Sequence, residues 1–257
     1  MPGTSPQAYP SAPNPTVRPR LRSVVIGGVV ATGFLLSAAV LALQFETGLG
    51  VQVTLLAALF SALPLFVVVP TFLWLDRYEA EPTRLLVLAF AWGAVCAPAG
   101  ALLLNTSFAV AMRLAGSEDP DVLTAVFSAP FVEEGLKGFG IVLIILLRRK
   151  EFDGVVDGIV YAGIVGAGFA FSENVLYLGR NFVDYGQQGL TELFILRCVM
   201  GPFAHPLFTA CTGIGLGLAV SVVRSGFARV LVVLGGYVIA ALLHGIWNLS
   251  AATGNLI

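Results

Sequence analysis

The chain has 257 residues, of which 57% are hydrophobic and only 11% are charged, and its mean hydropathy is +0.90. This composition leaves too little polar surface to cover a soluble globule of that length, so it excludes a soluble protein and predicts a polytopic membrane protein. The net charge of -1 at pH 7 says little about partners, because the charges lie in loops on different sides of the membrane.

The first 20 residues form a proline-rich segment with few side chains to bury. Its prolines are Pro2, Pro6, Pro10, Pro13, Pro15 and Pro19. Segments of this composition do not form a packed core. We therefore predict a disordered cytoplasmic tail over residues 1–20 and one transmembrane domain over residues 21–257.

Seven apolar runs follow the tail, each long enough to cross a hydrocarbon core of about 30 Å as a helix. They are residues 23–43, 51–75, 85–110, 122–147, 155–178, 202–223 and 230–250. A shorter apolar stretch, residues 191–200, ends at Gly201-Pro202 and could form an interfacial helix or a partial eighth span. The predicted fold is an all-α transmembrane bundle of seven or eight helices.

The basic residues predict the orientation of the bundle, because cytoplasmic loops hold the excess of Lys and Arg. With the N-terminus inside, ten of them fall on the cytoplasmic side: Arg18, Arg20, Arg22, Arg77, Arg84, Arg148, Arg149, Lys150, Arg224 and Arg229. Three fall on the outer side: Arg113, Arg180 and Arg197. This asymmetry predicts a cytoplasmic N-terminus and an outer C-terminus.

The fourth apolar run contains three ionisable residues, Glu133, Glu134 and Lys137. An ionised side chain in mid-membrane costs roughly 2.5–3.5 kcal/mol even on the lenient insertion scale, so three together indicate a function. Lys137 follows the two acids by four and three residues, which is the spacing of ion pairs on a helix. Because one lysine neutralises only one carboxylate, the other is a candidate general base.

Three later runs carry ionisable groups at a similar depth. Glu173 lies in the fifth run, His205 in the sixth and His244 in the seventh. At a rise of about 1.5 Å per residue, Glu134 and these three residues lie about 20–27 Å from the cytoplasmic ends of their helices. The sequence therefore predicts one polar layer, toward the outer face, to which four helices contribute.

Polar and aromatic residues accompany these ionisable groups. They are Phe169 and Asn174 beside Glu173, and Trp247 and Asn248 beside His244. Taken singly, an intramembrane His or Asn more often joins two helices by a hydrogen bond than serves as a ligand. The acid pair and the common depth of four helices favour a functional site.

Two chemistries are open to this set of residues. Glu173, His205 and His244 offer one carboxylate and two imidazoles, a set that could bind zinc and leave one position for water. Without a metal, the His244 imidazole and the Asn248 amide could bind an oxyanion. Because chains of Glu and His also mark proton and ion pathways, an ion-coupled membrane transporter is the alternative function.

The ordered motifs of the chain are Glu133-Glu134-x-x-Lys137, Phe169-x-x-x-Glu173-Asn174, His205, and His244-x-x-Trp247-Asn248, with the loop segment LDRYEAEP at residues 75–82. In this order they resemble the PrsW family of intramembrane proteases. The resemblance extends from residue 75 to residue 248. It also relates the chain to the CAAX prenyl endopeptidases and the bacteriocin-processing proteases, and implies that residues 21–257 are a protease-like domain.

The resemblance implies an enzyme of the bacterial cell membrane that hydrolyses a peptide bond of a single-pass membrane protein near the outer face. The implied substrate is typically an anti-sigma factor, cut at its first site. The implied partners are this substrate and the lipid bilayer, with no nucleic acid. Metal-dependent and glutamate-dependent chemistry both stay open.

The resemblance also implies roles for individual residues. Glu133 or Glu134 would activate the attacking water, with Glu133 favoured by the relatives. The other roles are water or oxyanion binding by His244 and Asn248, and positioning of substrate or water by Phe169, Asn174 and Trp247. The related enzymes have a His where this chain has Glu173, and His205 is the candidate for the missing imidazole.

Overall fold

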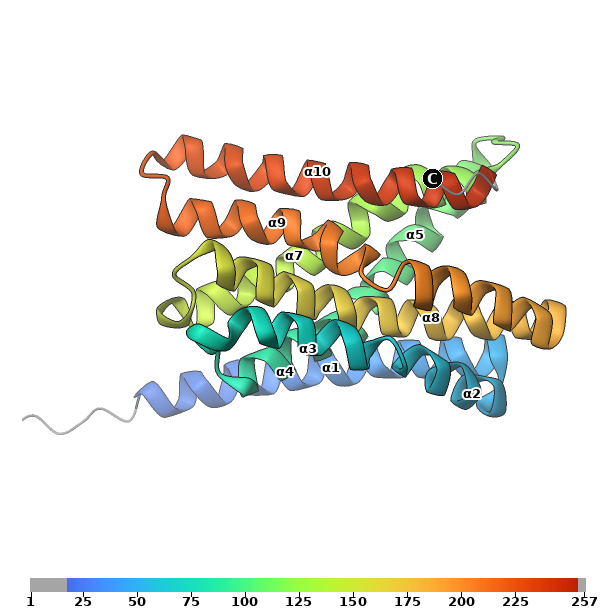
Figure 1. The fold of residues 1–257 in the computed structure, drawn as a ribbon, viewed down its shortest axis with the longest axis horizontal. Helices are drawn as coiled ribbons and strands as arrows, with labels where there is room; N and C mark the ends of the chain where they lie inside the picture. The colour runs from blue at the N-terminus through green and yellow to red at the C-terminus, as the bar shows by residue number, and fades with distance from the viewer. Residues whose placement is uncertain (1–17, 254–257) are drawn as a thin grey trace, which may run out of the picture.

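A computed structural model describes the backbone of residues 18–253 and the side chains of residues 24–251. In this part of the chain every regular element is helical, as predicted (Figure 1). The helices are α1 (Arg18–Leu49), α2 (Val51–Ala62), α3 (Leu65–Leu75), α4 (Thr83–Ala91), α5 (Ala97–Leu114), α6 (Pro120–Leu123), α7 (Ala129–Leu147), α8 (Val155–Phe194), α9 (Ala204–Ser221) and α10 (Gly226–Thr253).

Short helical turns connect several of these helices. Two are 3-10 turns, η1 (Asp76–Tyr78) and η4 (Arg149–Glu151), and three are π-helical turns, η2 (Trp92–Cys96), η3 (Thr124–Ser128) and η5 (Ile195–Met200). The predicted tail lies outside the described residues except for its last three, which begin α1.

Four helical segments are long and apolar enough to cross a membrane: Val24–Leu49, Thr83–Leu114, Val155–Ser221 and Gly226–Ala251. The pair α2 and α3, bent by 41° at Leu63-Pro64, makes a fifth if it counts as one span. A proline at this position removes a backbone donor and favours such a bend. Helix α7 carries three ionisable residues, which sets its composition apart from that of a simple span. The count of seven spans and the orientation of the N-terminus stay predictions.

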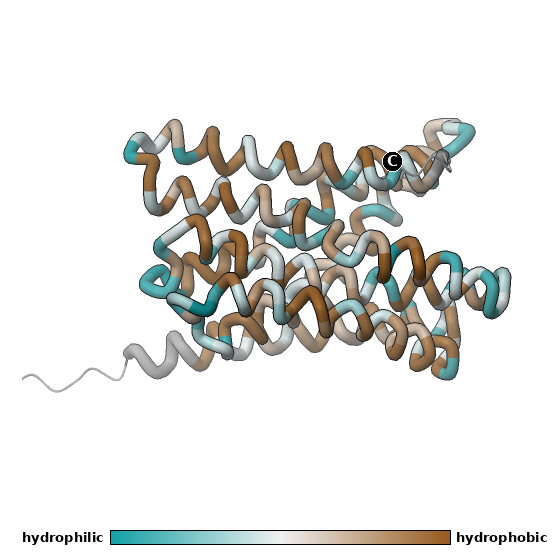
Figure 2. The backbone as a smooth tube through the Cα atoms, viewed as in Figure 1, coloured by the Kyte–Doolittle hydropathy of each residue, from teal (hydrophilic) through white to brown (hydrophobic). Residues whose placement is uncertain are grey.

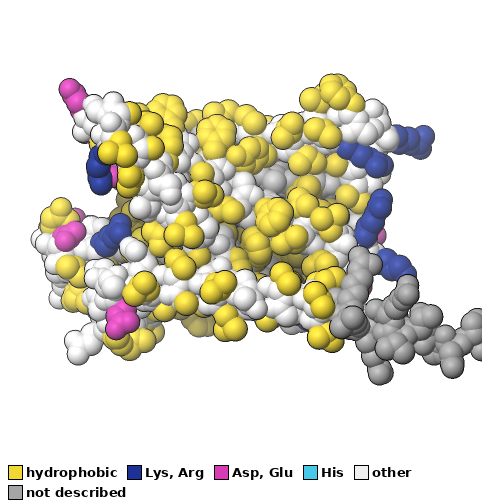
Figure 3. Space-filling model, turned by 180° about the vertical axis from the view of Figure 1, so that it is seen from behind, with side chains coloured by type: hydrophobic (Ala, Val, Ile, Leu, Met, Phe, Trp, Pro, Cys, Tyr) yellow, Lys and Arg dark blue, Asp and Glu magenta, His cyan; other side chains and the backbone are white. Residues whose placement is uncertain are grey.

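Hydrophobic residues follow the length of the helices, and hydrophilic residues gather at the turns at the two ends (Figure 2). The same division appears on the surface, where apolar side chains cover the region between two charged ends (Figure 3). Several Lys and Arg side chains lie at the end where α1 begins, and the opposite end carries Asp and Glu side chains together with further Lys and Arg. This distribution is the one expected of a protein immersed in a bilayer.

Helix α8 is the centre of the bundle, and glycines let its neighbours approach closely. Gly158 of α8 and Gly213 of α9 meet so closely that a Cβ on either would lie 2.1 Å from the carbonyl oxygen of the other. A Cβ on Gly168 would lie 2.3 Å from the Phe90 carbonyl oxygen on α4. The buried apolar core therefore forms where α8 faces α3, α4, α7 and α9.

Helix α8 reverses direction at Gly186. The backbone there has φ 63° and ψ -149°, a conformation that glycine tolerates and other residues rarely adopt. The chain then runs back along α8 through η5 before α9 begins (Figure 1). The apolar stretch 191–200 is therefore the returning arm of a helical hairpin, and it brings Arg197 against α8.

The loop segment LDRYEAEP lies against the start of α8. The backbone N–H of Glu81 donates to Asp76 Oδ2 at 2.9 Å, and the Tyr161 hydroxyl donates to Glu81 Oε2 at 2.5 Å. Burial raises the pKa of Glu81 to about 7, against the opposing effect of the Tyr161 hydrogen bond. The segment LDRYEAEP thus joins the α3–α4 connection to α8 and lies apart from the residues of the polar layer.

Candidate active site

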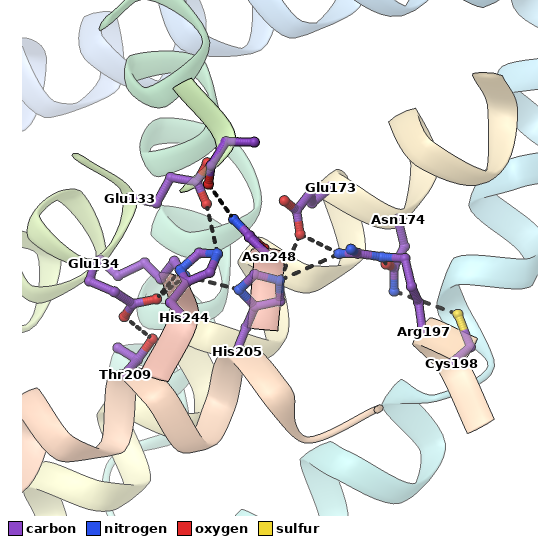
Figure 4. A network of polar contacts seen from close by, with 12 residues as sticks. Glu133, Glu134, Glu173, Asn174, Arg197, Cys198, His205, Thr209, His244 and Asn248 are labelled. Carbon is purple, nitrogen blue, oxygen red and sulfur yellow. Dashed lines mark hydrogen bonds and ion pairs between the residues drawn. The ribbon is translucent and has the colours of Figure 1, made fainter. Parts of the chain in front are cut away.

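Residues from four helices meet inside the bundle, as the common depth of their side chains predicted (Figure 4). Glu133 and Glu134 come from α7, Glu173 from α8, His205 from α9 and His244 from α10. Glu134 and His244 have no solvent-exposed surface, and the other three are almost fully buried. Each of these groups needs a partner, because an unpaired polar group in a dry interior is costly.

Glu134 has its partners on both carboxylate oxygens. Oε1 accepts a hydrogen bond from Lys137 Nζ at 2.6 Å and contacts His244 Nδ1 at 3.0 Å. Oε2 accepts a hydrogen bond from the Thr209 hydroxyl at 2.9 Å. Glu134 is therefore the acid that pairs with Lys137, and it also joins α7 to α9 and α10.

The Lys137 ammonium lies between this carboxylate and an imidazole. Nζ is 3.1 Å from His205 Nδ1 and lies 4.1 Å from the centre of the Phe169 ring, in cation–π geometry. The buried Phe169 ring therefore contacts the cation of the site. Lys137 has no exposed surface, so the groups that stabilise its charge are Glu134, His205 and the Phe169 ring.

Glu133 differs from Glu134, because only one of its oxygens has a hydrogen-bond partner among the described residues. Its Oε1 accepts a bond from Asn105 Nδ2 at 3.3 Å. Its Oε2 faces His244 Nε2 at 3.7 Å, too far for a direct hydrogen bond. Both of these facing atoms are buried and lack a hydrogen-bond partner in the described part of the chain.

A short chain of hydrogen bonds orients Glu133. Ser128 Oγ donates to Asn105 Oδ1 at 2.9 Å, so the amide nitrogen of Asn105 is turned toward Glu133. The bond from Asn105 occupies Oε1 and leaves Oε2 toward His244. The sequence analysis did not predict a role for Asn105, although a lone amide inside an apolar run indicates a hydrogen bond between helices.

The His244 ring is fixed on both sides. Nδ1 donates to Glu134 Oε1, which leaves the lone pair of Nε2 directed at Glu133 in the neutral ring. The Phe208 ring stacks on it, with 5.5 Å between ring centres and an angle of 22° between the planes. His244 is therefore held with one nitrogen available.

A second ion-pair group lies beside the first. Arg197, from η5, donates to Glu173 and, through Nε, to Asn174 Oδ1 at 2.7 Å. His205 Nε2 lies 2.7 Å from Glu173 Oε2. A ring that donates from Nε2 to Glu173 can accept from Lys137 at Nδ1, so both nitrogens of His205 are satisfied.

Arg197 corrects a prediction, since the sequence analysis had placed it in an outer loop as a topology residue. Its side chain is only 12% exposed and pairs with Glu173. The hairpin of α8 is the reason, because it turns Arg197 inward. The available signal was an arginine inside the apolar stretch 191–200.

Three residues predicted to bind or position substrate or water have partners within the bundle. Asn248 Nδ2 donates to the Ala125 carbonyl oxygen at 2.8 Å, which joins α10 to η3. Trp247 lies against Gly201, where a Cβ would be 2.7 Å from the indole ring. Asn174 Oδ1 accepts a hydrogen bond from Arg197 Nε. Their roles toward a substrate stay predictions.

The three buried donors closest together are Glu134, His205 and His244, whose ligand atoms lie within 4.8 Å of one another. The expected set had Glu173 as the acid, and the structure has Glu134 in its place because Glu173 is turned toward Arg197. Two imidazoles and one carboxylate fit zinc in donor type. Lys137 already contacts Glu134 and His205, however, so a metal at these atoms requires the ammonium to move.

A cavity of about 150 Å³ adjoins the site. Its lining includes Gln44 and Phe45 of α1, Thr106 of α5 and the two acids Glu133 and Glu173. Glu133, the acid with an unpartnered oxygen, therefore borders this cavity.

Carboxylates and imidazoles that meet inside apolar helices are the groups that general acid–base catalysis uses. The chain belongs to the PrsW family, which is described as a family of intramembrane metalloproteases and matches residues 81–257. The protein is thus an intramembrane peptidase and a multi-pass protein of a bacterial membrane. The family match begins after α1, α2 and α3.

Curated relatives agree with this assignment. Protease PrsW of Oceanobacillus iheyensis is 30% identical over 179 residues, which cover 69% of this chain and 75% of the relative. Protease PrsW of Geobacillus kaustophilus is 30% identical over 174 residues, with 67% and 69% covered. Protease PrsW of Bacillus subtilis is 28% identical over 173 residues, with 67% and 72% covered. No solved structure matches the chain.

Proposed function

We propose that the protein hydrolyses a peptide bond of a single-pass membrane protein near the outer face of the membrane, with Glu133 as the general base. The observation that carries this proposal is the unpartnered Oε2 of Glu133 opposite His244 Nε2, on an acid that also lines a cavity. A water bound to these two atoms can pass a proton to Glu133 Oε2 and donate its second hydrogen bond to His244 Nε2. Its oxygen is then free to attack a carbonyl carbon.

The proposed reaction is a general-base hydrolysis. The water oxygen forms a bond to the carbonyl carbon of the substrate while its proton passes to Glu133 Oε2. The carbon–nitrogen bond then breaks, and the proton on Glu133 passes to the departing amine. Lys137, held by Glu134, places a positive charge beside the developing negative charge.

Zinc is a proposal that the same residues support. Glu134, His205 and His244 would be its ligands once Lys137 has moved away. A zinc ion bound there would lower the pKa of a bound water and polarise the substrate carbonyl. The roles of Asn105 and Glu173 in orienting the site do not depend on the metal.

The proposed location near the outer face follows from the ends of α7. Glu133 lies near the first turn of this helix, and the basic residues Arg148, Arg149 and Lys150 follow its other end. Basic loops favour the cytoplasm, so we place the end of α7 that follows Leu147 on the cytoplasmic side and Glu133 in the outer half of the membrane. The same placement agrees with seven spans and a cytoplasmic N-terminus. An anti-sigma factor with one transmembrane helix is the proposed substrate, cut at its first site.

Co-expression tests this proposal. The protein is produced together with a panel of tagged single-span membrane proteins, anti-sigma factors among them, and the cut bonds are mapped by mass spectrometry. We expect cleavage in the outer part of the substrate's span, lost in Glu133→Gln and retained in Glu118→Gln, an exposed acid in the loop after α5. Equal cleavage by both variants would reject Glu133 as the base.

A further inference from the structure

Helix α1 is the least buried of the helices that are long and apolar enough to span a membrane. Only 6% of the apolar window of Val24–Leu49 is buried. The corresponding fractions are 44% for Thr83–Leu114, 78% for Val155–Ser221 and 22% for Gly226–Ala251. Helix α1 lies along one edge of the bundle (Figure 1). Little packing energy therefore opposes an outward movement of α1.

Two cavities lie under α1, one after the other. The first, about 190 Å³, is apolar and is lined by Phe34 of α1 together with Trp92 and Gly140. The second is the 150 Å³ cavity that Glu133 lines. Helix α1 thus lines both an apolar cavity and the cavity that borders the candidate active site.

An intact helix is poorly suited to hydrolysis at Glu133. Its carbonyl groups are engaged in backbone hydrogen bonds, and its side chains surround the backbone. An extended stretch exposes its carbonyl groups to the residues that line the cavity. The segment that reaches Glu133 must therefore be unwound.

An unwound stretch in a membrane needs hydrogen-bond partners for its backbone groups. The cavity offers the Gln44 amide of α1, whereas the Asn105 amide of α5 is already bonded to Glu133 and Ser128. The wider cavity between α3 and α4, about 590 Å³, is lined almost entirely by apolar residues such as Phe66 and Val87 and by none of the site residues. The smaller cavity is therefore better suited to a cleavable segment.

We propose that α1 is a lateral gate, and that an extended apolar segment of a membrane-spanning substrate enters between α1 and α5 to reach Glu133. This inference rests on the proposed proteolysis, for which it specifies the entry route and the conformation of the substrate. The Gln44 amide pairs with the substrate backbone at the gate. Outward movement of α1 opens the route without disturbing the core around α8.

Photocross-linking tests the route without relying on hydrolysis. A benzophenone amino acid replaces Phe45 at the gate or, as the matched control, Phe66 at the wider cavity, each in the Glu133→Gln protein in phosphatidylethanolamine–phosphatidylglycerol vesicles. The probe is a synthetic peptide with a span of about 20 Leu and Ala residues. One version carries a Gly-Gly pair in its outer third, and the other is uninterrupted.

We expect the benzophenone at position 45 to give about tenfold more cross-linking than the one at position 66. At position 45, the Gly-Gly peptide should react more than the uninterrupted peptide. Gln44→Leu should lower the yield at Phe45 by about tenfold, which corresponds to about 1.4 kcal/mol for one lost backbone partner. Equal or greater cross-linking from Phe66, or equal yields from the two peptides, would overturn the proposed gate.

The same experiment separates the gate from the proposed chemistry, because the protein with Glu133 intact is assayed for hydrolysis in parallel. Hydrolysis together with cross-linking only from Phe66 would reject the gate and leave the protease assignment in place. Cross-linking from Phe45 without hydrolysis of any substrate in the co-expression panel would support the gate and count against the proposed reaction.

Discussion

Glu133 Oε2 and His244 Nε2 face each other at 3.7 Å, and neither atom has a hydrogen-bond partner in the described part of the chain. The adjacent Glu134 has partners on both oxygens. Two neighbouring acids on one helix therefore differ in their partners, since Glu134 is fully engaged and Glu133 has one unpartnered oxygen.

Glu133→Gln and Glu134→Gln should consequently fail in different ways. Glu133→Gln loses the base, so we expect a rate lower by about 10²–10⁴-fold with little change in stability. Glu134→Gln leaves the buried Lys137 charge unpaired, so we expect a loss of about 3–5 kcal/mol in the free energy of unfolding. Thermal unfolding in detergent and a cleavage assay separate the two effects. Equal losses of stability would contradict the assignment.

Asn105→Ala should impair catalysis by releasing Glu133. The hydrogen bond from Asn105 to a carboxylate is worth about 1.5–3 kcal/mol, and its loss should lower kcat by about ten- to a hundredfold while KM changes little. Ser107→Ala is the control, because Ser107 is exposed and donates only to the Leu103 carbonyl on the same helix. A variant with altered KM and normal kcat would place Asn105 in substrate binding instead.

Arg197→Met should leave Glu173 without its cation and destabilise the protein by about 3–5 kcal/mol. The double variant Glu173→Gln/Arg197→Met should recover much of this loss, because no charge then stays unpaired. The control is Arg113→Ala, whose pair with Asp121 is 58% and 77% exposed and should matter by less than about 0.5 kcal/mol. Additive effects of the two changes at the buried pair would show that they do not interact.

Lys137→Met should increase zinc affinity, because the ammonium contacts two of the three candidate ligands. Metal content after dialysis against limiting zinc, measured by mass spectrometry, gives a readout that does not depend on activity. His244→Ala in the same background is the control and should reverse the increase. Stoichiometric zinc in the unmodified protein, with no increase in Lys137→Met, would show that Lys137 does not compete with the metal.

The pKa of Glu81, raised from 4.5 to about 7 by burial, predicts a pH dependence of stability. The folded state binds this proton more tightly than the unfolded state, so the free energy of unfolding should fall as pH rises from about 4.5 to 7. Glu81→Gln keeps an acceptor for Tyr161 and should flatten this dependence. Thermal unfolding at several pH values measures both proteins, and parallel curves would contradict the prediction.

Much of the site could be predicted from the sequence, because ionisable residues in apolar helices are costly and therefore conspicuous. Glu133, Glu134, Lys137, Glu173, His205 and His244 were recognised in this way, and the structure brings them together. Asn105 and Arg197 were not recognised as parts of the site. Their roles depend on contacts with α7 and α8 that no local pattern reveals.

The sequence by itself determined that the chain is a bundle of apolar helices with one polar layer, because composition and residue spacing set which groups the membrane penalises. Only the tertiary structure decided that Lys137 pairs with Glu134, that Arg197 reaches Glu173 and that Glu133 keeps a free oxygen. Spacing allowed Lys137 to pair with either acid. The choice depends on the rotation of α7 against α9 and α10, whose Thr209 and His244 lie 75 and 110 residues from Glu134 in the chain.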